Sequence, residues 1–341
     1  MGVPALAGVA VIARTLLLLG LLASPLAHSL AHAAQHHLLI VAGIGGTEEY
    51  RERFAATAQR LHDAALAANL DAANLSLLSA TELPEGAARR QQADKATLLQ
   101  AIANIAARAQ PGDRVFVVLI GHGNPRDDDA AFNLPGPDIT GTELNAALDA
   151  LAGRQLVIVN TASASGPFVA ALSAPGRVVI TATMSGREYH ATTFAEYFVA
   201  ALAESGEVSA DRDKDQRISM LEAFDYAKRE VERAFEREKK ILTEHALLDD
   251  NGDGDGSTAP GEYEADGALA DRVYLQQAPA LALGAAPELV AMFERRQAFE
   301  NSIAALKRRK QSLAHDDYYA QLELLLVDLA LLGREIRALE D

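Results

Sequence analysis

Two apolar segments that each end in small polar residues place the strongest constraint on the fold of this chain. Val118-Leu119-Ile120 runs into Gly121-His122-Gly123, and Val157-Ile158-Val159 runs into Asn160-Thr161-Ala162-Ser163. Uninterrupted apolar runs of this kind are typical of strands that are buried on both faces of a parallel sheet. The carboxyl ends of such strands share one edge of the sheet, where open α/β sheets bind their ligands. The sequence therefore predicts that His122 and Ser163 lie at one functional edge.

Strand-like and helix-like segments alternate through the first two hundred residues. Other apolar runs occupy residues 38–42, 75–78 and 177–183, and helical segments begin near Thr47, Lys95 and Thr142. We interpret the polar stretches 83–94 and 124–129 as loops. The alternation predicts an α/β fold, with a mostly parallel sheet covered by helices on both faces.

The amino terminus has the features of an export signal. Arg14 precedes an apolar run, Pro25 breaks that run, and Ala31-His32-Ala33 is a small-residue cleavage site. An uncleaved membrane anchor is the alternative, but the apolar run is short for a membrane span. We expect cleavage near Ala33, and hence a periplasmic or secreted protein with no membrane segment after cleavage. The pair His36-His37 beside this site is expected to be exposed.

Charge and composition exclude several functions. The net charge of −16 disfavours nucleic acid and anionic membrane surfaces as partners, since both attract basic patches. The chain has no cysteine, so it has neither disulfides nor a thiol nucleophile. Gly43-Ile44-Gly45-Gly46 is similar to a dinucleotide-binding loop, but Glu48 replaces its last glycine and would repel phosphate. We therefore expect no organic cofactor.

Two acidic loops follow the α/β segment. The first, residues 211–222, has the spacing of an EF-hand calcium loop, in which the ligand positions are Asp211, Asp213, Asp215, Arg217, Ser219 and Glu222. Gln216 stands where the turn prefers glycine, and the alternative is an acidic helix cap with solvated charges. The second loop, residues 249–262, has Thr258 at an aliphatic position and Pro260-Gly261 where a helix should leave. We expect Ca²⁺ at the first loop and a flexible acidic segment at the second.

The tail has a helical repeat. Residues 279–287 are expected to form a linker, and apolar residues then recur at heptad-like spacing on both sides of Asp316-Asp317. This pattern predicts an antiparallel helical hairpin that turns at these two aspartates. The hairpin either packs back on the domain or associates with a partner. The predicted organisation is thus a signal peptide (1–33), an α/β domain (34–278), and a linker with a helical hairpin or coiled coil (279–341).

The residues around His122 and Ser163 resemble the legumain-like (C13) peptidases, which have the caspase-type fold. That family carries a strand followed by His-Gly, and then a strand followed by Ala-Cys-x-Ser-Gly. This chain has His122-Gly123 and Ala162-Ser163-Ala164-Ser165-Gly166. Shorter similarities occur over residues 38–205: Val41-Ala42-Gly43 with Tyr50-Arg51, Phe132-Asn133-Leu134-Pro135, and Ile180-Thr181-Ala182-Thr183 with Arg187-Glu188.

The resemblance implies roles for four residues. His122 takes the position of the general base and Ser163 that of the nucleophile. The N–H groups of Gly123 and Ser163 would form an oxyanion hole, and Arg51 falls at the primary specificity pocket. Three residues depart from the family: Ser163 replaces the cysteine, Gly121 an acidic residue, and Gly45 an asparagine.

The exchange of cysteine for serine determines the expected function. A serine hydroxyl needs a base that is held in the correct tautomer, usually by a carboxylate. The nearest acidic residues are Asp127, Asp128, Asp129 and Asp138. We expect a catalytically degenerate homologue that binds a peptide or protein. The alternatives are an active hydrolase with a Ser163–His122 dyad, and a scaffold that acts through its C-terminal helices.

Overall fold

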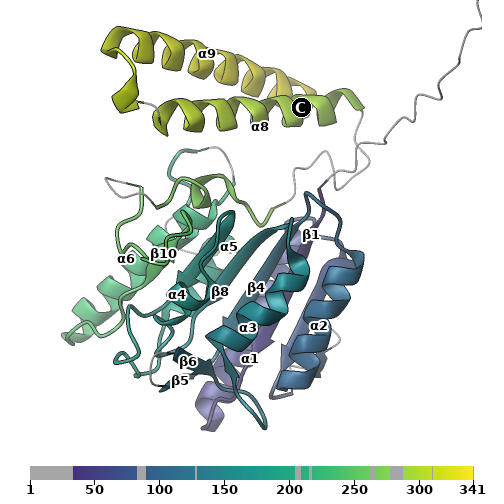
Figure 1. The fold of residues 1–341 in the computed structure, drawn as a ribbon, viewed down its shortest axis with the longest axis vertical. Coiled ribbons are helices and arrows are strands. Elements are labelled where there is room, and N and C mark those ends of the chain that lie inside the picture. Colours follow the sequence, from purple (N-terminus) through teal and green to yellow (C-terminus); the bar gives the residue numbers. More distant parts are fainter. Residues whose placement is uncertain are drawn as a thin grey trace, which may run out of the picture. The chain divides into compact units, whose positions relative to one another are not determined.

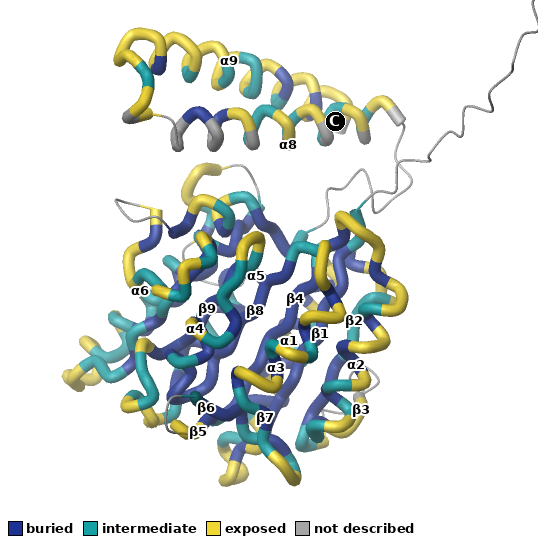
Figure 2. Tube along the Cα trace, in the orientation of Figure 1, coloured by how far each residue is buried: buried dark blue, intermediate teal, exposed yellow. Residues whose placement is uncertain are grey.

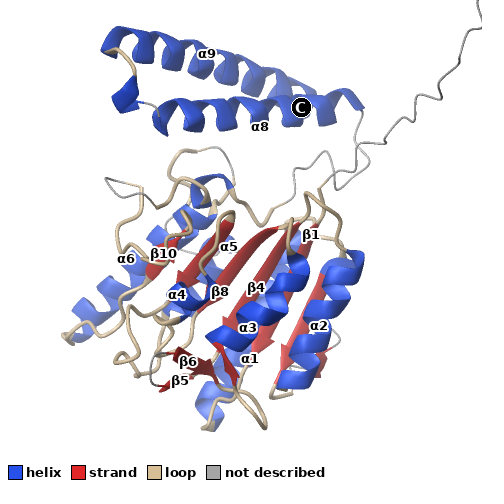
Figure 3. Ribbon diagram, viewed as in Figure 1, coloured by secondary structure: helices blue, strands red, loops and turns tan. Residues whose placement is uncertain are grey.

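A seven-stranded sheet lies at the centre of the α/β domain (Figures 1 and 3). The computed structural model describes residues 34–82, 90–126, 129–203, 209–214, 217–261, 266–276, 287–308 and 310–340. The predicted signal peptide and most of the predicted linker lie outside these ranges. The strand order is β10-β9-β8-β4-β1-β2-β3, with six parallel strands and β10 antiparallel at one edge. The predicted α/β class with a mostly parallel sheet is confirmed.

The strands agree with the apolar runs of the sequence. They are β1 (His36–Ala42), β2 (Leu75–Ser79), β3 (Arg90–Gln92), β4 (Arg114–Ile120), β8 (Gln155–Asn160), β9 (Arg177–Thr181) and β10 (Leu247–Asp249). Along β1 the side chains alternate between two cores. Leu38 and Ile40 belong to one core, whereas Leu39 and Val41 belong to the other. Burial on both faces explains why these strands read as continuous apolar runs, and Figure 2 shows the central strands buried along their length.

Helices cover both faces of the sheet. One core includes side chains of α1 (Glu48–Ala67), α5 (Phe194–Leu202) and α6 (Met220–Glu238). The other includes side chains of α2 (Lys95–Arg108), α3 (Gly141–Leu148) and α4 (Phe168–Leu172). Thr47 caps α1 as predicted, and Asp94, Thr140 and Ser219 cap α2, α3 and α6. These caps satisfy backbone N–H groups that the first helical turn leaves unpaired.

Five short strands differ from the prediction. β3 lies within the stretch interpreted as a loop, and β5 (Gly123–Arg126) pairs with β6 (Asp129–Phe132) across residues 124–129. β7 (Ile139–Thr140) completes this small antiparallel sheet. β10 begins just before the second acidic loop. Strands of two to four residues at a sheet edge carry too little periodicity to be distinguished from loops.

The pair His36-His37 is also placed differently from the expectation, because β1 begins at His36. Both side chains are buried. The Nδ1 atom of His36 lies 2.9 Å from the Leu275 carbonyl oxygen, and His37 Nε2 lies 3.3 Å from Asp113 Oδ2. Burial lowers the pKa of His36 to about 4, so its imidazole is neutral at pH 7.

The C-terminal segment forms the predicted helical hairpin. Helix α8 (Pro287–Arg308) and helix α9 (His315–Glu340) pack against each other (Figure 1). Asp316 and Asp317 lie in the first turn of α9 and not in the connection between the helices, which is a correction. Carboxylates favour this position because the helix dipole is positive at its amino end. Among the described residues, no helix combines the length and apolar character that a membrane crossing requires.

Candidate functional site

His122 and Ser163 lie at the same edge of the sheet, as predicted. β4 and β8 are adjacent and parallel, with Val118 beside Val159 and Leu119 beside Asn160. His122 follows the end of β4 by two residues, and Ser163 follows the end of β8 by three. The two parallel strands therefore deliver both side chains to the carboxyl edge, where α/β sheets place their sites.

The Ser163 hydroxyl forms two hydrogen bonds, both with the backbone of Gly123. Its Oγ accepts a hydrogen bond from the Gly123 N–H at 3.1 Å and lies 3.2 Å from the Gly123 carbonyl oxygen, to which it donates. The side chain is buried, with 2% of Ser163 exposed. The predicted oxyanion-hole donor, the Gly123 N–H, is thus occupied by the hydroxyl at the nucleophile position.

Close backbone packing explains the glycine at position 123. A Cβ atom there would lie 2.5 Å from the Ser163 carbonyl oxygen and 2.9 Å from that of Ala131. Both neighbours are backbone atoms that cannot move without disturbing a strand. Only glycine allows β5 to approach the end of β8 this closely.

The imidazole of His122 packs against helix α1. The rings of Tyr50 and Phe54 meet it edge-on, with ring centroids 4.8 Å and 5.0 Å away. Burial lowers the pKa of His122, a hydrogen bond to the Gly45 backbone opposes this shift, and the Arg53 charge adds to it. The ring is therefore neutral at pH 7. Among the described residues, no hydrogen bond joins it to the Ser163 hydroxyl.

The acidic residues proposed to orient His122 have other partners. Asp129 accepts hydrogen bonds from the N–H groups of Gly141 and Thr142 at the start of α3. Asp138 pairs with Arg126 at 2.9 Å. Asp127 and Asp128 lie outside the described residues. Within the described part of the chain, no carboxylate pairs with the imidazole, and the described residues assemble no Ser-His-Asp arrangement around it.

Arg51 and Arg53, which both lie on α1, contact different residues. Arg51 pairs with Glu48 one turn earlier and is partly exposed. Arg53 pairs with Glu196 on α5 and lies over the Tyr50 ring at 5.0 Å. Arg53 is therefore the arginine whose charge acts on His122. Contact of Arg51 with a substrate stays a prediction.

Sequence reasoning missed a second group of residues beside Ser163. Ala164 has a left-handed backbone with φ of +53°, and its N–H donates to the Glu188 carbonyl oxygen at 2.8 Å. The Glu188 carboxylate pairs with the imidazole of His245, which lies two residues before β10. Glu188 and His245 are 57 residues apart. Their meeting depends on the antiparallel return of β10 beside β9, which no local pattern indicated.

A buried carboxylate caps helix α5 at the same edge. Glu244 accepts hydrogen bonds from the N–H groups of Thr193 and Phe194, at 3.0 Å and 2.7 Å. Burial raises the pKa of Glu244 to about 7, although these hydrogen bonds favour the charged form. Glu244 is therefore partly protonated near neutral pH.

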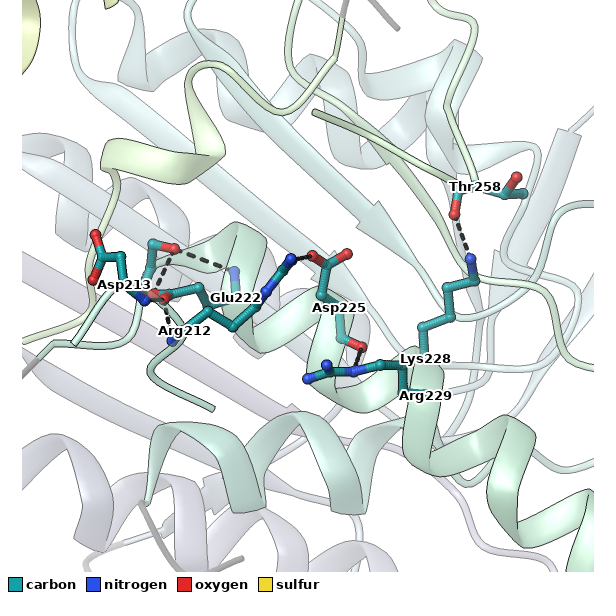
Figure 4. Close-up of polar contacts among 8 residues, drawn as sticks. Arg212, Asp213, Glu222, Asp225, Lys228, Arg229 and Thr258 are labelled. Carbon is teal, nitrogen blue, oxygen red and sulfur yellow. Dashed lines mark hydrogen bonds and ion pairs between the residues drawn. The ribbon is translucent and has the colours of Figure 1, made fainter. Parts of the chain in front are cut away.

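The first acidic loop gathers three of the six predicted calcium ligands. Carboxylate oxygens of Asp211, Asp213 and Glu222 lie within 4.8 Å of one another. Asp215 lies outside the described residues, and the Arg217 side chain pairs with Glu300 of α8 at 3.0 Å. The Glu222 carboxylate also accepts a hydrogen bond from the N–H group of Arg212 (Figure 4). It accepts another from the N–H group of Ser219, which caps α6. The donor set is oxygen-rich, as Ca²⁺ requires. Calcium binding at this loop stays a prediction.

Several loops at the carboxyl edge of the sheet carry exposed apolar side chains. Four of them lie on loops at the carboxyl edge of the sheet, and we call them the apolar rim: Ile44, Met184, Tyr189 and Ile241. Among the exposed large apolar side chains described between residues 34 and 276, only Leu66 lies elsewhere, at the end of α1.

The sheet order, the helices on both faces, and a histidine beside a hydroxyl residue at one sheet edge define a caspase-like α/β protein. Residues 92–246 match the Peptidase C13 family, and this stretch contains His122, Gly123 and Ser163. This stretch of the chain is similar to that family, with serine at the position where the family resemblance requires cysteine.

Two solved structures are similar to the chain. Protein GSU0716 from Geobacter sulfurreducens has a TM-score of 0.40 and 13% identity, and the match covers 62% of this chain and 92% of that protein. The Drosophila initiator caspase Dronc has a TM-score of 0.42 and 12% identity, with 64% and 80% covered. No curated protein matches the sequence.

Proposed function

We propose that this protein is an exported member of the C13 peptidase family that has lost peptidase activity and binds a peptide or protein at the carboxyl edge of its sheet. The observation that carries the loss of activity is the pair of hydrogen bonds between the Ser163 hydroxyl and Gly123. The apolar rim supports binding at the same edge. The apolar run before Ala33 supports export.

Catalysis by Ser163 would require three changes at once. The hydroxyl would have to leave its two partners on Gly123, each hydrogen bond being worth about 1 kcal/mol. It would have to pass its proton to His122, which no described carboxylate orients. The Gly123 N–H would then have to turn from Ser163 to a substrate oxygen. A cysteine needs less help, because its thiolate forms near neutral pH.

A serine-directed phosphonate tests the loss of activity. We expect no covalent adduct on the wild-type protein after prolonged incubation, measured by intact mass spectrometry. A serine hydrolase that reacts with the same probe serves as the positive control. An adduct on Ser163 that disappears in His122→Ala would contradict the proposal and establish the hydrolase alternative.

Peptide binding is tested at the apolar rim. Fluorescence anisotropy with a library of labelled peptides should detect binding to the wild-type protein. Tyr189→Ser should weaken the best binder by about tenfold, since it removes an exposed aromatic contact. Leu66→Ser is the matched control, because it removes an exposed apolar side chain away from the rim. Equal binding by all three proteins would exclude the rim as the binding surface.

The hydrolase alternative rests on a specific observation. His122 and Ser163 follow adjacent strands, and the Gly123 N–H lies between them in sequence and contacts Ser163. A rotation of Ser163 away from Gly123 would free this donor. The phosphonate experiment distinguishes the two functions.

A further inference from the structure

Helix α9 has two apolar faces, and α8 covers one of them. Tyr318, Leu332 and Ile336 are buried in the hairpin. A different face carries Tyr319, Leu322, Leu326 and Ala330, which line a shallow groove together with Glu323 and Val327. Tyr319 is 43% exposed, Leu326 48% and Val327 49%. A helix that is apolar on two faces is typical of one that packs against two neighbours.

We propose that this groove binds the α9 helix of a second copy of the chain, in an antiparallel arrangement about a two-fold axis at Leu326. A two-fold interface uses the same surface of both copies and must therefore complement itself. The groove meets this condition in both the size and the charge of its residues.

Side-chain size is complementary about Leu326. Tyr319 and Leu322 are the large residues of the amino-terminal half of the groove face, and Ala330 and Gly333 are the small residues of the carboxyl-terminal half. In an antiparallel pair centred on Leu326, Tyr319 faces Gly333 of the second copy and Leu322 faces Ala330. Large residues then pack against small ones in both halves, which allows close helix packing.

Charge is complementary in the same arrangement. Asp316, Asp317 and Glu323 lie in the amino-terminal half of α9, whereas the carboxyl-terminal half carries Arg334 and Arg337 together with Glu335. An antiparallel pair brings Asp316 near Arg334 of the second copy, whereas a parallel pair would place like charges together. The carboxylate of Glu323 in the groove and the net charge of −16 favour a protein partner over a lipid surface.

Sedimentation equilibrium of the full chain tests this proposal. Between about 1 and 100 µM we expect a monomer–dimer equilibrium. Leu326→Glu should raise the dissociation constant at least about tenfold, because it places two carboxylates opposite each other at the two-fold axis. Leu324→Glu is the matched control. Leu324 is 64% exposed on α9 but does not line the groove, so this variant should dimerise like the wild type.

A charge exchange tests the orientation of the helices. Asp316→Arg and Arg334→Asp should each weaken the dimer a few-fold, and the double variant should recover most of the loss. Circular dichroism of every variant establishes that α9 still folds. A wild-type protein that remains monomeric at the highest concentration would overturn the proposal. Equal loss in Leu324→Glu and Leu326→Glu would overturn it as well. Neither result depends on what the carboxyl edge of the sheet binds.

Discussion

At the scale of single residues, Ser163 links two strand ends through one hydroxyl group. Replacing it with alanine leaves the N–H and the carbonyl of Gly123 without this partner in a buried position. We expect Ser163→Ala to lower the free energy of unfolding by about 1–2 kcal/mol, measured by urea denaturation.

Ser173→Ala is the matched control for this prediction, because the buried Ser173 hydroxyl has no hydrogen-bond partner among the described residues. It should change the free energy of unfolding by less than about 0.5 kcal/mol. If Ser163→Ala is as stable as Ser173→Ala, the hydroxyl of Ser163 does not secure the two strand ends.

The raised pKa of Glu244 predicts that the stability of the fold depends on pH. Its pKa is about 7 in the folded protein and 4.5 for the free side chain, so the folded state binds more protons between these values. The resulting stabilisation is present below pH 4.5 and is lost as the pH rises to 7. The loss amounts to at most about 3 kcal/mol.

The variant Glu244→Gln cannot ionise and should not show this loss. The difference in unfolding free energy, variant minus wild type, should therefore increase between pH 5 and pH 7 and then level off. Urea denaturation at several pH values measures it. A difference that stays constant with pH would show that Glu244 does not titrate in this range.

The limits of sequence-based prediction are clearest at these same residues. The positions at which the two apolar runs end were sufficient to place His122 and Ser163 at one edge of the sheet. The direction of each side chain was not predictable from the sequence. Tyr50 and Phe54 of α1 pack against the His122 ring, and Gly123 forms hydrogen bonds with the Ser163 hydroxyl. Glu188 and His245 could not be paired from sequence, since β10 brings them together.

At the scale of secondary-structure elements, helix caps and long apolar runs were predictable and short edge strands were not. Thr47 began α1 as its sequence indicated, and β4 and β8 ended where small residues begin. The hairpin of β5 and β6 was missed because Gly123-Asn124-Pro125-Arg126 has the composition of a turn. Its pairing with β6 is set by the tertiary fold.

The start of α6 provides a prediction for the acidic loop. Glu222 completes a capping box with Ser219 and also accepts hydrogen bonds from the loop. Glu222→Gln should therefore lower the free energy of unfolding by about 1 kcal/mol without calcium. If the loop binds Ca²⁺, titration calorimetry should give heat with the wild type and none with this variant.

Glu236→Gln is the control for this experiment, because it removes an exposed carboxylate from the same helix. It should retain the calcium heat of the wild type. The absence of heat with the wild-type protein would show that Glu222 serves only as a helix cap.

At the scale of the whole molecule, the alternation of strands and helices determines the architecture, and the hairpin adds a separate surface. The described part of the α/β domain begins at residue 34, and the boundary at residue 33 stays a prediction. The fold begins directly after this boundary. The Gln35 N–H donates to Asp113 Oδ1 at 2.8 Å, and the Gln35 carbonyl accepts from the Arg114 N–H.

Cleavage near Ala33 should therefore leave the α/β domain intact. We expect the protein, expressed with its leader in a bacterium, to have a mature amino terminus at or close to Ala34, measured by intact mass and amino-terminal sequencing. Ala33→Leu should block processing, because the position before the cut requires a small side chain. Ala23→Leu, in the apolar run, should still be processed, since that run only has to remain apolar. Full-length wild-type protein in the membrane fraction would instead indicate an uncleaved anchor, and full-length wild-type protein in the cytosol would exclude export.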